Sequence, residues 1–332
     1  MVNHRLILDL VERTGEAPRG STVTVELGED TAAAQTVAAW CERAGHALVQ
    51  VRGTTAVVRC GPAVDVLAGI EPEQVPGTRV WLYTNFDCNL ACDYCCARSS
   101  PRTPRRALGL DRVRRLAAEA ADAGVSELLL TGGEPFLLPD IDQLANACTR
   151  HLPTTLLTNG MLFRGSRLDR LRAMDRTRLA VQISLDSATP EPHDRHRGVG
   201  TWAKAVEGIR IAGSEGFRVR VAATVPAEHT HQVDGFHAFL DTLGIARADQ
   251  IIRALAHRGV AENGVELTIE SLIPEITVTA EGVYWHPVGA DHADQLVTRE
   301  LFPLVRAITE VRRRFIEYRT SASATAQWFP CA

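Results

Sequence analysis

The sequence predicts an α/β protein. Its centre is a partial (β/α)6 TIM-like barrel, with a small N-terminal α/β two-layer domain and a short C-terminal hairpin-helix extension. Strand-like apolar runs alternate with amphipathic helical runs through the middle of the 332 residues. Polar and glycine-containing motifs directly follow several of these runs, which is typical of the carboxyl ends of parallel strands. The expected domains are residues 1–70, 71–260 and 261–332.

The first domain is predicted from periodicity and turn residues. Its expected elements are a helix around residues 6–11, a strand over 22–27, a helix that Asp30 or Thr31 can cap and that runs to about Ala44, and strands over 47–51 and 55–59. Gly45 is expected to end the second helix. A turn near Gly53 is expected to join the last two strands. The segment 61–77, rich in Pro and Gly, is interpreted as a linker.

The middle of the chain alternates regularly between strand and helix patterns. Strands are expected over 80–84, 127–130, 154–157, 179–184, 218–224 and 250–255. Helices are expected over 111–123, 141–151, 166–174, 201–215 and 233–243. Six strands with intervening helices predict a parallel sheet that forms a barrel or an open partial barrel. Chemistry in such folds lies at the carboxyl ends of the strands.

The last part of the chain has a different pattern. Residues 266–270, and 275–279 with Gly282–Trp285, are interpreted as short antiparallel strands. A closing helix is expected from about Ala293 to Tyr318, because its apolar residues recur near one face.

Composition excludes several classes of protein. The net charge of −4 gives no basic surface for nucleic acid or for an anionic membrane. No apolar run is long enough for a transmembrane helix, and the N-terminus lacks a signal-peptide pattern. Four of the eight cysteines fall within residues 88–96, which favours a metal or redox site in a reducing compartment over a disulfide framework. We therefore expect a cytoplasmic protein.

Cys88, Cys92 and Cys95 have the spacing CxxxCxxC and directly follow the first barrel strand. Thiolates at such short spacing can surround one compact metal centre. Three protein ligands leave one iron open for a substrate or cofactor, whereas a fourth ligand would complete a structural zinc site. Cys96 is left out, because adjacent cysteines rarely both point into one cluster. A structural zinc knuckle remains the alternative for this cluster.

Three more motifs accompany the cysteines. Leu130–Pro135 (LTGGEP), Thr158–Gly160 (TNG) and Ser184–Asp186 (SLD) follow the second, third and fourth predicted strands. With Tyr94 in the aromatic position before the last cysteine, the chain resembles the radical S-adenosylmethionine (SAM) superfamily over residues 79–255. Each motif alone is also compatible with an ordinary strand-to-helix turn.

The resemblance implies one [4Fe–4S] cluster held by Cys88, Cys92 and Cys95, with SAM bound beside it. It implies that seven residues bind SAM: Tyr94, Gly132, Gly133, Glu134, Ser184, Asp186 and Arg197. The two glycines would let the backbone approach the methionine part, and the Glu134 carboxylate would accept from its ammonium group. Tyr94 would lie near the adenine. Ser184 and Asp186 would lie at the carboxylate or ribose, and Arg197 at the carboxylate, although Arg197 is equally compatible with a surface charge.

The activity implied by the resemblance is reductive cleavage of SAM to a 5′-deoxyadenosyl radical, which abstracts hydrogen from a substrate. An electron donor of the flavodoxin or ferredoxin type would be a partner. The substrate would be a ribosomal peptide precursor or, alternatively, a small natural-product, nucleoside or cofactor intermediate. No catalytic side chain is assigned. From another class of function, a non-catalytic iron–sulfur or metal-binding module is the alternative.

The two flanking regions carry resemblances of their own. Residues 1–60 resemble the sulfur-carrier family but lack its first strand and Cys-Pro-x-Pro motif, so a docking or structural role is expected. The stretch from Ile276 to Pro287 resembles the twitch/SPASM-like extension of peptide-modifying radical SAM branches, with His286 in the place of a cluster cysteine. Because only Cys331 follows, a degenerate extension without a second cluster is expected, with His286 as a pocket or packing residue.

Overall fold

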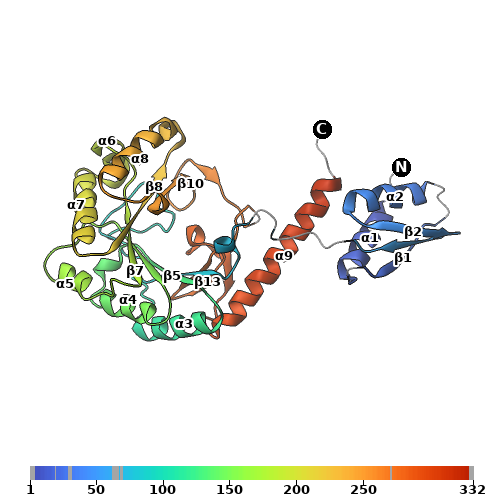
Figure 1. Cartoon of the computed structure of the whole chain (residues 1–332), viewed down its shortest axis with the longest axis horizontal. Helices are drawn as coiled ribbons and strands as arrows, with labels where there is room; N and C mark the ends of the chain where they lie inside the picture. Colours follow the sequence, from blue (N-terminus) through green and yellow to red (C-terminus); the bar gives the residue numbers. More distant parts are fainter. Residues whose placement is uncertain are drawn as a thin grey trace. The chain divides into compact units, whose positions relative to one another are not determined.

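The computed structural model describes residues 4–18, 20–28, 32–61, 67, 70–269 and 271–328. The expected helix cap at Asp30 or Thr31, and Cys331, lie outside the described residues. The chain divides into two compact units (Figure 1). The first comprises residues 1–69 and 316–332, and the second comprises residues 70–315.

The first unit contains a three-stranded antiparallel sheet and two helices. Its elements are α1 (His4–Glu16), β1 (Thr22–Glu26), α2 (Ala33–Ala44), β2 (Ala47–Arg52) and β3 (Thr55–Arg59), and the strand order is β1-β3-β2. Both helices contribute to one core with Val25 of β1 and Val58 of β3, so they cover the same face of the sheet and form a second layer. Gly45 ends α2 in the left-handed conformation, with φ of 71°.

The second unit contains the expected open barrel. Its parallel strands are β4 (Arg79–Tyr83), β5 (Glu127–Thr131), β6 (Thr154–Thr158), β7 (Leu179–Ser184), β8 (Arg218–Val225) and β9 (Gln250–Ala254), adjacent in this order. The helices between them are α3 (Leu110–Asp122), α4 (Ile141–Thr149), α5 (Ser166–Arg172), α6 (Pro190–Arg197), α7 (Thr201–Ser214) and α8 (Val233–Thr242). The helices form an outer layer around the strands (Figure 1). The predicted partial (β/α)6 fold is confirmed.

Helix α6 was not expected from the sequence. Pro190 begins it at a position where a missing backbone N–H costs nothing. The helix carries Arg197 in its last turn. It follows the Ser184–Asp186 motif closely in the chain, and its Arg197 bonds to Asp186.

The C-terminal hairpin continues the barrel sheet. β12 (Ile276–Thr279) pairs in parallel with β4 and antiparallel with β13 (Gly282–Tyr284), and β14 (Leu296–Thr298) pairs with β13. The resulting sheet has nine strands in the order β14-β13-β12-β4-β5-β6-β7-β8-β9. Residues 70–315 therefore form one unit, without the expected boundary at residue 261.

Two expectations for this region are wrong. The antiparallel strand expected over 266–270 is absent among the described residues there, because β11 (Val265–Glu266) pairs in parallel with β10 (Ala256–His257). The last helix, α9, covers Leu304–Trp328 and begins later than Ala293. Residues 296–298 pair in the sheet instead, and the helix begins after Pro303 with the Leu304 N–H donating to Glu119 Oε2 at 2.6 Å.

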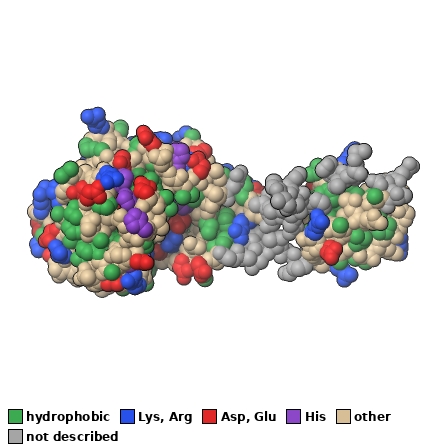
Figure 2. All heavy atoms as spheres, turned by 90° about the horizontal axis from the view of Figure 1, so that it is seen from above, with side chains coloured by type: hydrophobic (Ala, Val, Ile, Leu, Met, Phe, Trp, Pro, Cys, Tyr) green, Lys and Arg blue, Asp and Glu red, His purple; other side chains and the backbone are tan. Residues whose placement is uncertain are grey.

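The surface agrees with the modest net charge. Figure 2 shows acidic and basic side chains interspersed over one face of the barrel unit, with several histidines among them. Among the described residues, no helix is long and apolar enough to span a bilayer.

Candidate active site

The three spaced cysteines line one cavity of about 230 Å³ at the carboxyl end of the sheet. They lie on the loop after β4, and residues at the ends of β5, β6, β7 and β8 complete the wall. Within this loop, Cys88 Sγ accepts from the Leu90 N–H at 3.4 Å, and Cys95 Sγ accepts from the Ser99 N–H at 3.3 Å. The loop backbone therefore orients two of the three sulfurs.

Burial makes Cys88 and Cys92 weak acids. Desolvation raises the pKa of Cys88 to about 12 and that of Cys92 to about 11, and Arg197 opposes the shift at Cys92. These two thiols are therefore protonated near neutral pH, and a bound metal must displace their protons. A set of soft sulfur donors around one cavity suits an iron–sulfur cluster or a similar thiophilic centre.

Cys96 lies at the same cavity as the three spaced cysteines. Burial raises its pKa to about 12, and Tyr83 and Arg253 are among its surroundings. No group of three or more His, Cys, Asp or Glu side chains among the described residues is arranged to hold a single metal ion. A cluster differs from a single ion in that each thiolate binds its own iron.

The two glycines of the LTGGEP motif lie where the β4 and β5 loops touch. A Cβ on Gly132 would lie 2.4 Å from Asn85 Oδ1, and one on Gly133 would lie 2.2 Å from the Asp87 carbonyl oxygen. The backbone joins there as well, because the Gly133 N–H donates to the Asn85 carbonyl at 3.0 Å. Both glycines also line the cysteine cavity. Packing against the cysteine loop thus gives a reason for each glycine, and their contact with SAM stays a prediction.

Glu134 is fully buried and bonded within the protein. Its Oε1 accepts from the Thr158 hydroxyl at 2.7 Å and from the Phe136 N–H at 3.0 Å, and its Oε2 accepts from the Asn159 N–H at 2.8 Å. Burial raises the pKa of Glu134, and these hydrogen bonds oppose the shift. The carboxylate therefore ties the β5 end to the β6 end. Its predicted bond to the SAM ammonium would be an additional contact.

The TNG motif connects this carboxylate to the cysteine loop. Asn159 Nδ2 donates to Asn89 Oδ1 at 2.8 Å, and Asn89 lies between Cys88 and Cys92 in the chain. The motif thus fixes the loop from the side of β6.

Asp186 organises the next wall of the site. Its carboxylate accepts from Arg197 Nε at 2.6 Å, from the Tyr94 hydroxyl and from the Thr224 N–H at 3.0 Å. Arg197 holds the pKa of Asp186 below its ordinary value despite burial, and Asp186 helps to raise that of Arg197. The structure brings the predicted residues Tyr94, Asp186 and Arg197 into contact. Ser184 lines the cysteine cavity with Arg197 and Tyr94.

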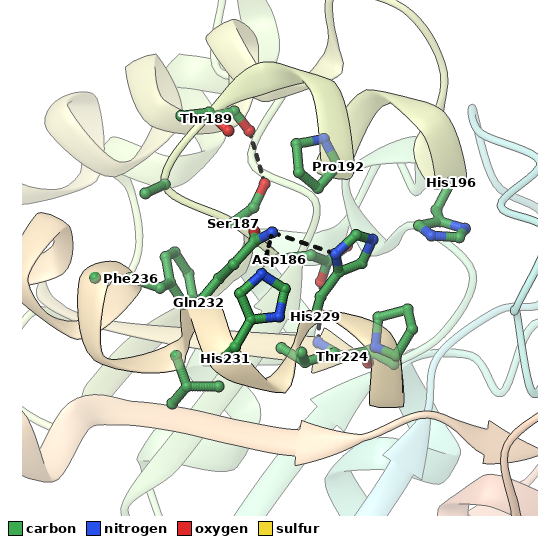
Figure 3. Close-up of a pocket in the computed structure, with 15 residues that line it drawn as sticks. Asp186, Ser187, Thr189, Pro192, His196, Thr224, His229, His231, Gln232 and Phe236 are labelled. Atoms are coloured by element: carbon green, nitrogen blue, oxygen red, sulfur yellow. Dashed lines mark hydrogen bonds between the residues drawn. The ribbon is translucent and has the colours of Figure 1, made fainter.

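A second cavity of about 290 Å³ lies beside Asp186, between α6 and the start of α8. Figure 3 shows Asp186 and Ser187 on one wall and His229, His231 and Gln232 on the opposite wall. Gln232 Nε2 lies 3.4 Å from a ring nitrogen of each of these two histidines. Asp186 lines this cavity, whereas its partner Arg197 lines the cysteine cavity.

A cavity of about 910 Å³, larger than the other two, begins at Tyr94 and extends along β9 to the loop at 260–265. Sequence reasoning missed Arg253, which lines both this cavity and the cysteine cavity. A signal was available, because a charged residue near the end of the sixth predicted strand lies at the edge where barrels place chemistry.

Together these features define an open α/β barrel with a thiolate site at the carboxyl ends of its strands. Residues 82–243 match the family model described as the radical SAM superfamily. This domain therefore belongs to the radical SAM superfamily. The donor set fits the cluster of that family, because one buried and two half-buried cysteines line one cavity with the strand-end motifs around them.

Individual relatives match over less than half of the chain. An AdoMet-dependent heme synthase of Methanosarcina barkeri is 32% identical over 148 residues, which cover 44% of this chain and 42% of the relative. The mycofactocin maturase MftC of Mycobacterium ulcerans is 33% identical over 161 residues, which cover 48% and 43%. The chain thus spans less than half of the length of these curated relatives.

A solved structure supports the fold. The structure of anSMEcpe with bound AdoMet and a peptide is similar with a TM-score of 0.55 at 13% identity, over 72% of this chain and 82% of that chain.

Proposed function

We propose that the chain is a radical SAM enzyme in which Cys88, Cys92 and Cys95 hold one [4Fe–4S] cluster and SAM binds beside it. The observation that supports this most is the shared cavity of the three thiols with the LTGGEP, TNG and SLD strand ends. When bound, the cluster supplies one electron for cleavage of SAM to a 5′-deoxyadenosyl radical that abstracts hydrogen from the substrate.

In the proposal, the chain's own residues bind and orient SAM and the substrate, and they exclude water from the site. Gly132 and Gly133 allow the close approach of the β5 loop to the cysteine loop, and Glu134 fixes the neighbouring strand ends. Asp186 holds Tyr94 and Arg197 in a bonded group at the side of the cavity. In the proposal Ser184, Tyr94 and Arg197 contact SAM from this wall, and the two glycines and Glu134 contact its methionine part.

The proposed substrate is a peptide, and the proposed location is the cytoplasm. Support comes from MftC and from the subtilosin biosynthesis protein AlbA of Bacillus subtilis, 35% identical over 143 residues, whose name assigns it to the synthesis of a bacteriocin. A small-molecule substrate is the second candidate, because the heme synthase and a GTP 3′,8-cyclase also match. An electron donor of the flavodoxin or ferredoxin type would be the redox partner.

Anaerobic reconstitution with iron and sulfide, followed by dithionite and SAM, tests the proposal. We expect about four irons per chain and formation of 5′-deoxyadenosine, measured by liquid chromatography. Cys95→Ala should abolish both the cluster absorbance and the product.

Cys96→Ala is the matched control, because it removes the adjacent thiol outside the CxxxCxxC spacing. A wild-type protein that binds iron but makes no 5′-deoxyadenosine would instead support a non-catalytic metal–sulfur module. A zinc-loaded protein that binds no iron would support the structural zinc alternative.

A further inference from the structure

Two arginines line the cysteine cavity, and their surroundings differ. Arg197 donates to both oxygens of Asp186, at 2.6 and 3.2 Å. Arg253, at the end of β9, is exposed and has no hydrogen-bond or ion-pair partner for its guanidinium among the residues that the structure describes. The positive charge of Arg197 is therefore compensated within the protein, whereas that of Arg253 is available to a ligand.

Two neutral side chains lie near Arg253. The guanidinium acts on Tyr83 and His286, and the acidic group that also acts on Tyr83, Asp291, lies 3.6 Å from Arg98. Burial raises the pKa of Tyr83 and lowers the pKa of His286 to about 3, so both are uncharged near neutral pH. A cation beside neutral side chains is a favourable site for an anion, and the guanidinium fork matches a carboxylate.

The larger cavity beside Arg253 has the opposite charge along the rest of its wall. Its other charged or titratable lining residues are Asp93, Tyr94, His196, Glu228 and Glu262. Asp93 lies 3.0 Å from His196 Nδ1, whereas Glu228 and Glu262 are exposed. Both glutamates line only this cavity, and Arg253 lies where it meets the cysteine cavity. A ligand that fits this charge distribution has its carboxylate at Arg253, toward the cysteines. Its neutral or cationic groups lie along the acidic wall of the larger cavity.

We infer that Arg253 binds the carboxylate of the substrate, and that the substrate is a peptide or an amino-acid derivative with a free carboxylate and a neutral or cationic remainder. The inference deepens the proposed function and rests on it. The open side of the barrel supports an elongated ligand, because β9 is the last strand of the sheet and the 910 Å³ cavity follows residues 252–255 along it. SAM also has a carboxylate, so the test must separate the two sources.

The experiment uses equilibrium dialysis of the reconstituted full chain with SAM. The probe is a mixture of tripeptides prepared in two forms, with free C-terminal carboxylates and with C-terminal amides, and retention is measured by mass spectrometry. We expect wild type to retain the acids up to about fivefold better than the amides, since an ion pair at an exposed arginine contributes up to about 1 kcal/mol. Arg253→Gln should lose this preference, and Arg253→Lys should keep part of it.

Arg150→Gln is the matched control. It removes an exposed arginine just after α4 for which the described residues include no ion-pair partner, and it should leave the preference unchanged. Arg150→Gln should also keep the formation of 5′-deoxyadenosine without peptide, and SAM affinity should be equal in wild type and Arg253→Gln.

Three results would overturn the inference. Wild type could retain acids and amides equally, or the preference could survive in Arg253→Gln. A roughly tenfold loss of SAM affinity in Arg253→Gln would assign the arginine to the SAM carboxylate instead. If wild type makes no 5′-deoxyadenosine, the proposed function fails, and the dialysis still reports whether Arg253 selects carboxylates.

Discussion

The wall around Asp186 and the wall around Arg253 face the same cavity but are built in opposite ways. At the first wall, buried charges and polar groups satisfy one another across the cysteine loop, β7, β8 and α6. At the second wall, a cation that has no bonded partner among the described residues stands beside the neutral His286 and a large cavity. The difference indicates that the first wall holds the site in shape, whereas the second is free to bind a ligand.

Removal of a buried partner should separate the two walls most clearly. Asp186→Ala leaves the Arg197 charge without its carboxylate. This charge is buried, since the side chains of Asp186 and Arg197 are only 5% and 11% exposed. We expect the free energy of unfolding to fall by about 3–5 kcal/mol. Arg253→Gln should change it by less than about 0.5 kcal/mol, since no partner loses a bond.

Urea unfolding followed by circular dichroism measures both variants. The double variant Asp186→Ala/Arg197→Met removes both charges and should recover part of the stability, because an unpaired buried charge costs more than a missing pair. Equal losses for Asp186→Ala and Arg253→Gln would contradict the distinction between the walls.

The walls were not equally accessible to sequence reasoning. The cysteine spacing and the strand-end motifs are local patterns that predicted the site, and the apolar runs are local patterns that predicted the six strands of the fold. The bond between Tyr94 and Asp186 joins residues 92 positions apart. The bond between Arg197 and Asp186 depends on a helix, α6, that the polar segment did not reveal. The pairing of β12 with β4 is also long-range, which is why the hairpin was expected as a separate extension.

Acidification should weaken the first wall through His193. Its ring is 1% exposed, its Nδ1 accepts from the Asp186 N–H at 3.2 Å, and burial lowers its pKa from 6.5 to about 4. The unfolded chain therefore binds a proton that the folded chain refuses between about pH 6.5 and 4, and stability falls as the pH falls through this window. The loss from His193 should reach about 2 kcal/mol near pH 5.

His193→Asn keeps a hydrogen-bond acceptor without the titration. Urea unfolding at several pH values should show a shallower decline for this variant than for wild type. Part of the decline should persist, because His286 at the second wall also has a lowered pKa, of about 3. An unchanged pH dependence in His193→Asn would assign the loss to other groups.

The smallest expected effect concerns Thr158, which extends the bonded wall to β6. Thr158→Val retains the shape of the side chain but removes the hydroxyl that donates to Glu134 Oε1 and accepts from the Gly160 N–H at 3.1 Å. We expect a loss of about 1–2 kcal/mol in the free energy of unfolding, because two buried partners lose a bond. Thr158→Ser keeps the hydroxyl and should lose less.

If the wall orients the cysteine loop through Asn159 and Asn89, Thr158→Val should also lower the iron retained after reconstitution, whereas Arg253→Gln should not. Equal iron in Thr158→Val and Thr158→Ser would limit the role of this hydroxyl to stability.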